Sequence, residues 1–471
     1  MNSAHRSSRR TWLSRRRFLT AAGFAALAAC RGGFEQPRQD TVPQPASGTI
    51  TWLQRAQPVE VEWAERIVLP RLRELAPNVT INLTLESGNW ADKVFTLYAA
   101  GTPPDVHNGI VGTFIQLYAQ EEVLELTPLI KRDKIDLSPF GGFQNDPDMC
   151  RSGKQWELPV LTTLGQGIFY NMDLFDKAGL PYPPTDWQDR SWTMERMAEV
   201  ARRLTTNWGA EDAVYGLVTT AQFHFWAYPW GGDPFKPEWY AHGIATETQA
   251  DHPLVVQSLQ FRVDLIYRYQ VHPTPGEQSR IAQGGHPFKT GRVAMWWGTG
   301  WEYASLAEGA GFRLGFAPFP WKATNKTVAF TDGVMITRRT KAPEASWALV
   351  KYLTSREGQL EYARATKRPP TRQDALEPWV TSTFPLTGFT TVRQFEQATF
   401  GFLSNYIDNW AHYTINAREL QAIQDREGPV MWRNEASPAQ HMPVVKQHMD
   451  AVLREAYERF KDTRLLKDTR C

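Results

Sequence analysis

Large aromatic side chains gather in two short stretches of this sequence, and their chemistry is that of flat contact surfaces. Residues 295–303 read MWWGTGWEY, and residues 223–235 read FHFWAYPWGGDPF. Such side chains fill a core, insert into a bilayer or form a surface for a flat ligand. In a strand, Trp296 and Trp297 point to opposite faces, so we expect one of them in the core and the other free for a ligand.

Polar side chains follow two predicted strands at the point where each strand ends. Gln54 and Arg55 end the first strand, and Asn108 ends the third, after His107. Open α/β sheets present ligand-binding loops at such strand ends. Asn108 is therefore a candidate partner for a ligand hydroxyl, and Arg55 is either a ligand contact or a solvated surface charge.

The N-terminus reads as an export signal rather than as part of the fold. Residues 1–29 hold six arginines and no acid, and the apolar run at 18–29 is too short to span a bilayer, which takes about 20 residues. The run SRRRFL at 14–19 resembles a twin-arginine signal. LAAC at 27–30 resembles a lipoprotein cleavage site, at which Cys30 carries the lipid.

Without residues 1–29, the 52 basic side chains become 46, against 50 acidic ones. The excess of basic over acidic side chains in the full chain comes from the signal. The charge of the remaining chain therefore offers no electrostatic support for a nucleic-acid partner. Residues 30–48 contain the lipidated cysteine and a flexible tether rich in Pro and Gly. The other two cysteines, Cys150 and Cys471, could form a disulfide, but we expect free thiols.

Hydrophobic periodicity predicts the helices and strands that position the candidate residues. Strand patterns at 50–53 and 79–85 flank a helical pattern at 59–75, which is the strand–helix–strand signature of an α/β sheet. Residues 328–337 predict a strand broken at Asp332–Gly333. Further helices are predicted at 93–100, 173–178, 193–204, 254–269 and 342–353, a strand at 213–219, and a helical tail from about 395.

Five segments in chain order resemble a known family. They are AGTPPDV (100–106), YNMDLF with AGLPYPP and Trp187 (170–187), FKTGRVAM (288–295), Asp332–Gly333 with PEASWALVKYLTSREG (343–358), and Arg368–Pro370. Together they resemble the extracellular solute-binding proteins of sugar-type ABC importers, the maltose-binding-protein-like group.

The resemblance implies an α/β fold of two lobes joined by crossing strands, the type II periplasmic-binding-protein fold, here with a helical C-terminal extension. By analogy, the N-terminal lobe comprises 49–158 plus 288–325, and the C-terminal lobe comprises 165–285 plus 327–471. The chain is expected to cross between the lobes near Pro159–Gly165 and Phe316–Trp321.

The resemblance also implies a function. A lipid-anchored monomer outside the cytoplasmic membrane, or in a periplasm, is expected to capture a sugar, with an oligosaccharide favoured. It is expected to deliver this ligand to an ABC permease with a cytoplasmic ATPase. No cofactor, metal or catalytic group is implied.

A sugar site needs aromatic rings against the C–H face of the sugar and polar groups along its hydroxyl edge. Trp301 is expected to face the ligand because the family's aromatic lies there, and Gly298 would let backbone approach it. Trp226, Trp230 and Trp297 are either platforms or core. The expected ligand-binding set is Gln54, Arg55, Asn108, Thr163, Trp226, Trp230, Asp233, Trp297, Gly298, Trp301, Asp332 and Arg368.

Two alternatives stay open. A glycerol-phosphate ester or another non-sugar solute would use Arg55 and Arg368 as anchors. A glycan-active enzyme would need two opposed carboxylates, which sequence alone does not exclude. No HExxH, GxSxG, CxxC, GxGxxG or P-loop pattern occurs in the chain, which favours a binding protein over an enzyme.

Overall fold

The computed structural model of the protein describes residues 46–468, except for residues 111, 144–145, 147–148, 220–221, 330, 405 and 409–413. The predicted signal (1–29), the lipidated Cys30 and nearly all of the tether (30–48) lie outside the described residues.

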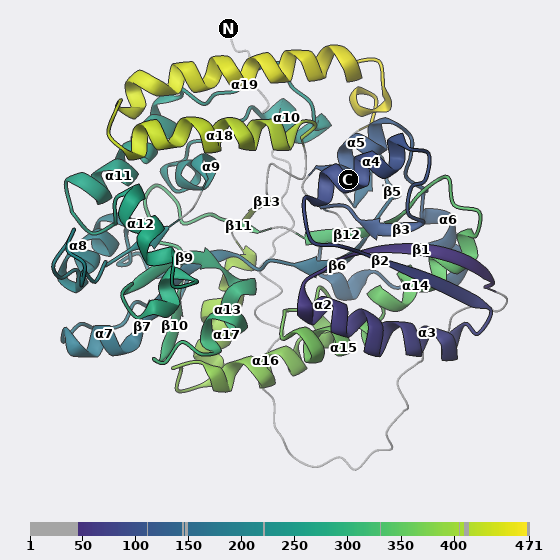
Figure 1. The fold of residues 1–471 in the computed structure, drawn as a ribbon, viewed down its shortest axis with the longest axis horizontal. Coiled ribbons are helices and arrows are strands. Elements are labelled where there is room, and N and C mark those ends of the chain that lie inside the picture. The colour runs from purple at the N-terminus through teal and green to yellow at the C-terminus, as the bar shows by residue number, and fades with distance from the viewer. Residues whose placement is uncertain are drawn as a thin grey trace, which may run out of the picture. The chain divides into compact units, whose positions relative to one another are not determined.

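A five-stranded sheet forms the centre of what we call the first lobe (Figure 1). The strand order is β2-β1-β3-β12-β6, with β1 and β2 paired in parallel along their whole length. The register of β12 against β6 shifts between Asp332 and Gly333, which confirms the predicted break. The strands are β1 (Gly48–Arg55), β2 (Val79–Glu86), β3 (Val106–Asn108), β6 (Leu158–Thr162) and β12 (Thr331–Ile336).

Helices cover both faces of this first sheet. Successive side chains of strand β1 point to opposite faces of the sheet, and both faces are apolar. Ile50 and Trp52 join one hydrophobic cluster with Trp63 and Trp347. Leu53 joins another cluster with the helices after β2. The predicted helix at 59–75 is α2 (Pro58–Trp63), one π-helical turn (Ala64–Val68) and α3 (Leu69–Leu75). The other helices of this lobe are α4 (Trp90–Ala99), α5 (Thr113–Ala119), α6 (Thr127–Asp133), α14 (Pro343–Thr354) and α15 (Arg356–Thr366).

A four-stranded sheet in the order β10-β7-β9-β8 forms the centre of the second lobe. β9 pairs with β7 on one side and β8 on the other, so the MWWGT stretch lies inside the sheet. The strand expected at 213–219 is shorter than predicted. The strands are β7 (Gln166–Asn171), β8 (Val218–Thr219), β9 (Met295–Thr299) and β10 (Leu314–Ala317).

The helices of the second lobe match the predicted amphipathic patterns where these were strong. In α8, for example, the Thr193 side chain caps the helix by accepting from the Arg196 N–H at 3.1 Å. These helices are α7 (Met172–Lys177), α8 (Met194–Leu204), α9 (Phe223–Ala227), α10 (Pro237–His242), α11 (Pro253–Tyr267), α12 (Pro275–Ala282) and α13 (Tyr303–Ala307).

Two segments belong to the lobe opposite to the one we expected. Residues 288–325 were assigned to the N-terminal lobe, but β9 and β10 pair with β7 in the second sheet. Residues from 327 were assigned to the C-terminal lobe, but β12 pairs with β3 and β6 in the first sheet. The assignments are wrong for these strands because a strand pattern reveals burial, not which distant strand it will pair with.

The first crossing between the lobes is where it was predicted. β6 ends at Thr162 in the first sheet and β7 begins at Gln166 in the second. The return crossing lies later than 316–321, because Trp321 still bridges to Thr193 of the second lobe. Between Trp321 and β12, the short strand β11 (Thr327–Ala329) pairs in parallel with β13 (Tyr406–Asp408).

The C-terminal part crosses between the lobes again. α16 (Glu377–Thr383) packs on α15, and α17 (Val392–Phe400) packs on β10. α18 (Ala417–Trp432) and α19 (Pro438–Phe460) lie side by side and contact α11, as Figure 1 shows.

After α19 the chain returns to the first lobe, which differs from the expected range 327–471. Phe460 and Leu465 join the hydrophobic cluster of Tyr118 and Trp156. Asp468 accepts a hydrogen bond from the Ser152 hydroxyl at 2.9 Å. The last described residues are therefore held by the first lobe.

Cys150 is disulfide-bonded, so the expectation of a free thiol there is wrong. Sequence spacing carries no information on whether a fold brings two cysteines together. Cys471 lies outside the described residues, as Cys30 does. Within the part of the chain that the structure describes, no helix combines the length and apolar character needed to span a membrane.

Candidate functional site

Four of the predicted site residues come together at the junction of the lobes. Arg55 and Asp332 lie at the first sheet, Arg368 is located just after α15, and Trp301 lies just beyond β9 of the second sheet. A further residue, Glu60, joins the two arginines. We call Arg55, Glu60, Trp301, Asp332 and Arg368 the Glu60 cluster.

Glu60 lies in the first turn of α2, directly after β1. The chain is extended at Gln57, the residue that precedes the helix, and Pro58 fits the first helical position because it needs no hydrogen-bond partner there. The Glu60 side chain has no solvent exposure. A buried carboxylate is costly unless it is paired and hydrogen-bonded, so the partners of Glu60 determine whether this arrangement is stable.

Arg55 binds Glu60 through two nitrogens. Its Nε donates to Glu60 Oε2 at 3.0 Å and its Nη2 donates to Oε1 at 2.6 Å. Its Nη1 lies 4.0 Å from Asp332 Oδ2. Burial alone would lower the pKa of Arg55, but the charges of Glu60 and Asp332 outweigh it and raise the pKa above the ordinary value.

Arg368 reaches the same carboxylate from another element. Helix α15 ends at Thr366, and the next residue, Lys367, has a left-handed backbone with a φ of 54°, so the chain turns there. Arg368 then donates through Nη1 to Glu60 Oε1 and through Nη2 to Gln57 Oε1. The packing of α15 on α2, with the Trp63 and Tyr362 rings 5.1 Å apart, fixes this approach.

Trp301 brings the second lobe to the cluster. The backbone N–H of Trp301 donates to the Thr163 carbonyl at 3.0 Å, so the crossing segment fixes the backbone of Trp301. The guanidinium carbon of Arg368 lies 5.4 Å from the centre of the Trp301 ring, a cation–π contact. Trp301 is 37% exposed, whereas the other tryptophans of the two aromatic stretches are buried.

The other predicted tryptophans of the second lobe form a second group, inside the core. We call Trp226, Trp230, Phe261, Trp297 and Phe319 the second-lobe aromatic core. The Trp226 and Trp297 ring centres are 4.4 Å apart, Trp297 lies 4.5 Å from Phe319, and Trp230 lies 5.2 Å from Phe261. These rings fill the space between the second sheet and α9 and α11.

The expectation that one of Trp296 and Trp297 is free for a ligand is wrong. Both are buried, Trp297 in the aromatic core and Trp296 against His286 at 4.6 Å. Strand β9 has a neighbour on each side and packing on each face, so the alternation of side chains directs both rings into the protein. Trp297 Nε1 donates to Gln166 Oε1 at 2.9 Å.

Other predicted residues have structural partners of their own. The Asn108 side chain donates to the Gly333 carbonyl at 3.2 Å and thereby ties β3 to β12. Gln54 is buried at the end of β1. A Cβ at Gly298 would lie 2.7 Å from Nε1 of the buried Trp296 ring, so the glycine is needed for packing within the chain.

Asp233 braces the loop after α9. It accepts from the Phe235 N–H at 2.8 Å and from the Tyr240 hydroxyl at 2.7 Å. Burial raises the pKa of Asp233 to about 6, and the two hydrogen bonds oppose the rise.

Sequence reasoning missed Glu60, the residue that joins the two arginines. Its signal is weak: an acid in the first turn of a helix is a common feature that favours the helix dipole. An acid five residues after Arg55, on the helix that comes after the first strand, could nevertheless have marked it as a partner of that arginine.

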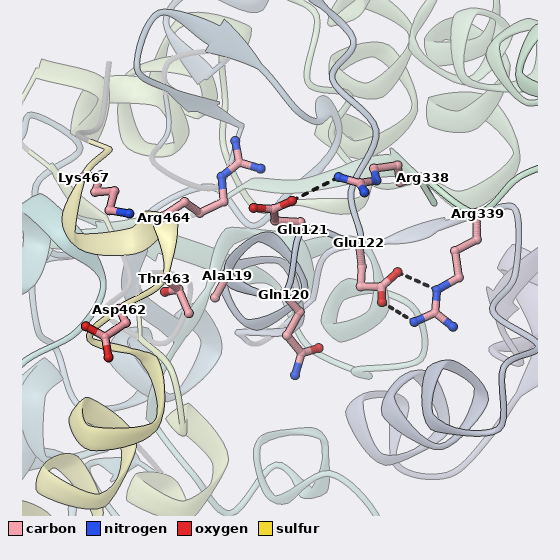
Figure 2. Close-up of a pocket in the computed structure, with 10 residues that line it drawn as sticks. All are labelled: Ala119, Gln120, Glu121, Glu122, Arg338, Arg339, Asp462, Thr463, Arg464 and Lys467. Carbon is pink, nitrogen blue, oxygen red and sulfur yellow. Dashed lines mark hydrogen bonds and ion pairs between the residues drawn. The ribbon is translucent and has the colours of Figure 1, made fainter.

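A separate pocket lies on the first lobe, where the C-terminal segment returns (Figure 2). Two ion pairs line it, Glu121 with Arg338 at 3.2 Å and Glu122 with Arg339. None of the predicted site residues lines this pocket. Its described lining is mostly charged and includes no aromatic ring, so its chemistry is not that of the predicted site.

The family can be read from the sequence match. The model of the bacterial extracellular solute-binding proteins matches residues 56–360, more than half of the chain. The chain belongs to this family. The resemblance drawn from the five motifs is thereby confirmed, and the solute-binding protein has the two-lobe α/β fold that the resemblance implied.

Solved structures share the fold of this solute-binding protein. An ABC substrate-binding protein of Listeria monocytogenes, in complex with cycloalternan, aligns with a TM-score of 0.72 at 20% identity, over 86% of this chain and 99% of that one. The GacH receptor of Streptomyces glaucescens, solved unliganded and with acarbose, aligns with a TM-score of 0.66 at 19% identity, over 87% and 99%.

A curated relative supports the same assignment. A Brucella abortus protein described as a binding protein is 23% identical over 338 residues, which cover 67% of this chain and 75% of that protein.

Proposed function

We propose that this solute-binding protein captures a neutral sugar, an oligosaccharide above all, at the Glu60 cluster and delivers it to an ABC permease. The observation that carries the proposal is the composition of the cluster: an exposed tryptophan ring lies beside two arginines whose charges are balanced by two carboxylates.

The balance of charge favours a neutral ligand. Arg55 and Arg368 were the expected anchors of a phosphate ester. Both instead bind Glu60, and Asp332 lies 4.0 Å from Arg55. Because two positive and two negative side chains cancel, a doubly charged phosphate would gain little here. It would also repel the carboxylates.

The remaining hydrogen-bond donors suit hydroxyl groups. A guanidinium has five N–H groups, and two on each arginine are used in the bonds to Glu60 and Gln57. The side chains of Arg55 and Arg368 are 21% and 17% exposed. Donors of this kind bind sugar hydroxyls, and the Trp301 ring offers a face for the C–H groups of the sugar.

The cluster also suits capture by lobe closure. Trp301 belongs to the second lobe, whereas Arg55, Glu60 and Asp332 belong to the first. A ligand that contacts both sides stabilises the closed arrangement by its difference in affinity for the closed and open states. This mechanism requires no chemical step, which agrees with a binding protein rather than an enzyme.

Export and anchoring complete the proposal. The run that resembles a twin-arginine signal and the cleavage-site pattern before Cys30 support a lipid anchor outside the cytoplasmic membrane, and we propose that the anchored protein is a monomer. In that position the loaded protein would meet the permease and its ATPase partner.

A thermal-shift screen of the purified protein tests the ligand class. Neutral mono- and oligosaccharides, glycerol-phosphate esters, polyamines and short peptides would be compared. A ligand at a hundred times its Kd adds about 2.7 kcal/mol to the free energy of unfolding, which produces a shift of several degrees. A shift with neutral oligosaccharides alone is expected. A shift with phosphate esters alone, or turnover of a glycan in the same wells, would refute the proposal.

A further inference from the structure

We propose that Glu60 is a positioning residue that sets the charge preference of the ligand site. By holding two arginines on one buried carboxylate, it keeps the site selective for neutral ligands, and its neutralisation would convert the site into one that binds anions. This inference rests on the proposed function and extends it to the selection between sugars and charged solutes.

The Glu60 carboxylate binds both arginines. Glu60 accepts three bonds from the arginines, two from Arg55 and one from Arg368. A glutamine in its place has one acceptor oxygen and an N–H₂ group, and the latter cannot accept from a guanidinium. Glu60→Gln therefore removes one negative charge and at least one of the bonds that orient the arginines.

The side chains of Arg55 and Arg368 are accessible to solvent. Both are partly exposed, and Arg368 also lies over the Trp301 ring. Their charge is therefore available where we place the ligand, and is not shut away in a core. Arginine binds phosphate and carboxylate through two parallel hydrogen bonds, so an arginine pair lacking one of its counter-charges is a good anion site.

Glu60 is a fully buried acid. Its side chain has no exposure to solvent, so water and salt screen it poorly. The electrostatic interaction of a buried negative charge with the two arginines is therefore stronger than that of an acid on the surface. Glu62, in the same helix, is 61% exposed and pairs with Arg66 at 2.9 Å, which makes it a matched control.

The test compares the purified wild type with Glu60→Gln, Glu62→Gln and the double variant Glu60→Gln/Arg368→Gln. Isothermal titration calorimetry measures the binding of maltotriose and of glycerol 3-phosphate to each. Glu60→Gln is expected to bind glycerol 3-phosphate about tenfold to a hundredfold more tightly than the wild type, an effect that falls as salt is added. Glu62→Gln is expected to match the wild type. The double variant, in which the charge balance is restored, is expected to lose the gain.

Thermal denaturation shows whether Glu60→Gln is folded. If it is not, Asp332→Asn provides the second variant, because it removes the other carboxylate near Arg55 and is expected to raise anion affinity by a smaller factor. A folded Glu60→Gln or Asp332→Asn without any gain in anion affinity would overturn the inference. A wild type that binds glycerol 3-phosphate as tightly as Glu60→Gln would overturn it as well.

Different measurements would refute the proposed function and this inference. Wild type that binds maltotriose, together with a Glu60→Gln variant that gains no anion affinity, leaves the proposed function intact and removes this inference. Wild type that binds neither maltotriose nor any other neutral sugar removes the proposed function.

Discussion

The core tryptophans of the second lobe and Trp301 have opposite surroundings although their sequence contexts are alike. Trp226 and Trp297 stack within the second-lobe aromatic core, and Trp226 has no exposure to solvent. Trp301, four residues after Trp297, is 37% exposed and lies under an arginine. The difference arises at the end of the strand, because β9 ends at Thr299 and the chain leaves the packed sheet before Trp301.

An abundance of aromatic residues in a segment does not by itself make an aromatic ring accessible to a ligand. Rings inside the second lobe contribute mainly to its stability, because they remove apolar surface from water. A ring at the lobe junction contributes little to stability and remains available to a ligand. Substitutions in the two groups should therefore affect different quantities.

The largest expected effect is on stability. Trp226→Ala should lower the free energy of unfolding by about 3–5 kcal/mol, because it leaves a cavity in the aromatic core. Denaturant unfolding measures the change. Trp301→Ala is the control and should cost about 1 kcal/mol or less, since a surface substitution leaves no cavity. Equal losses of unfolding free energy in the two variants would contradict the distinction between a core tryptophan and an accessible one.

The next effect is on affinity. Trp301→Ala should weaken the binding of a neutral oligosaccharide about tenfold to a hundredfold, roughly 1.4–2.8 kcal/mol, because the sugar loses its stacking surface. Isothermal titration calorimetry measures it. Trp301→Phe, which keeps a ring, should recover most of the affinity. An unchanged affinity in Trp301→Ala would place the ligand elsewhere.

A smaller effect is on the pH dependence of stability. The pKa of Asp233, about 6, lies above its ordinary value of 3.8, so the folded protein holds this proton more tightly than the unfolded chain. The resulting stabilisation is fully present below about pH 4 and is lost as the pH rises to about 6. In the wild type, the free energy of unfolding should therefore fall by on the order of 1–3 kcal/mol between about pH 4 and pH 6 because of Asp233, and Asp233→Asn should remove this fall.

Unfolding curves collected between pH 4 and 7 would reveal that dependence. A wild-type curve and an Asp233→Asn curve that stay parallel over the whole range would contradict the prediction. Sugar affinity should respond little to this substitution, because Asp233 braces the second lobe through Phe235 and Tyr240.

The smallest effect concerns one hydrogen bond in the core. Trp297→Phe keeps an aromatic ring but leaves the Gln166 amide oxygen without its 2.9 Å donor. The lost bond should cost about 1 kcal/mol of stability, to which the smaller ring adds the cost of the space it leaves, with no change in affinity. A loss of sugar affinity with stability unchanged would move Trp297 into the ligand site.

Much of the fold could be predicted from the sequence. The strand–helix–strand unit at 48–86 and the break at Asp332–Gly333 carry local signals, namely periodicity, a proline boundary and a glycine. The order of five motifs indicated the family and with it the two lobes. The assignment of β9 and β12 to their sheets could not be predicted, because pairing is decided between distant segments.

The candidate site was predicted only in part, and for a physical reason. Arg55, Trp301 and Arg368 were named from strand ends and motifs. The meeting of the two arginines on Glu60, and with it the contact of Arg368 with Trp301, depends on how α15 packs against α2. A period of two tells which side chains share a face of a strand. It does not tell whether the other face is covered, and this is why Trp296 and Trp297 are both buried.

A crystal structure of the protein with maltotriose tests the central claim most directly. We predict a sugar ring against the exposed face of Trp301, with its hydroxyls accepting hydrogen bonds from Arg55 and Arg368 while Glu60 holds both arginines. A sugar bound in the charged pocket at Glu121 and Arg338, or anywhere away from Trp301, would contradict the account.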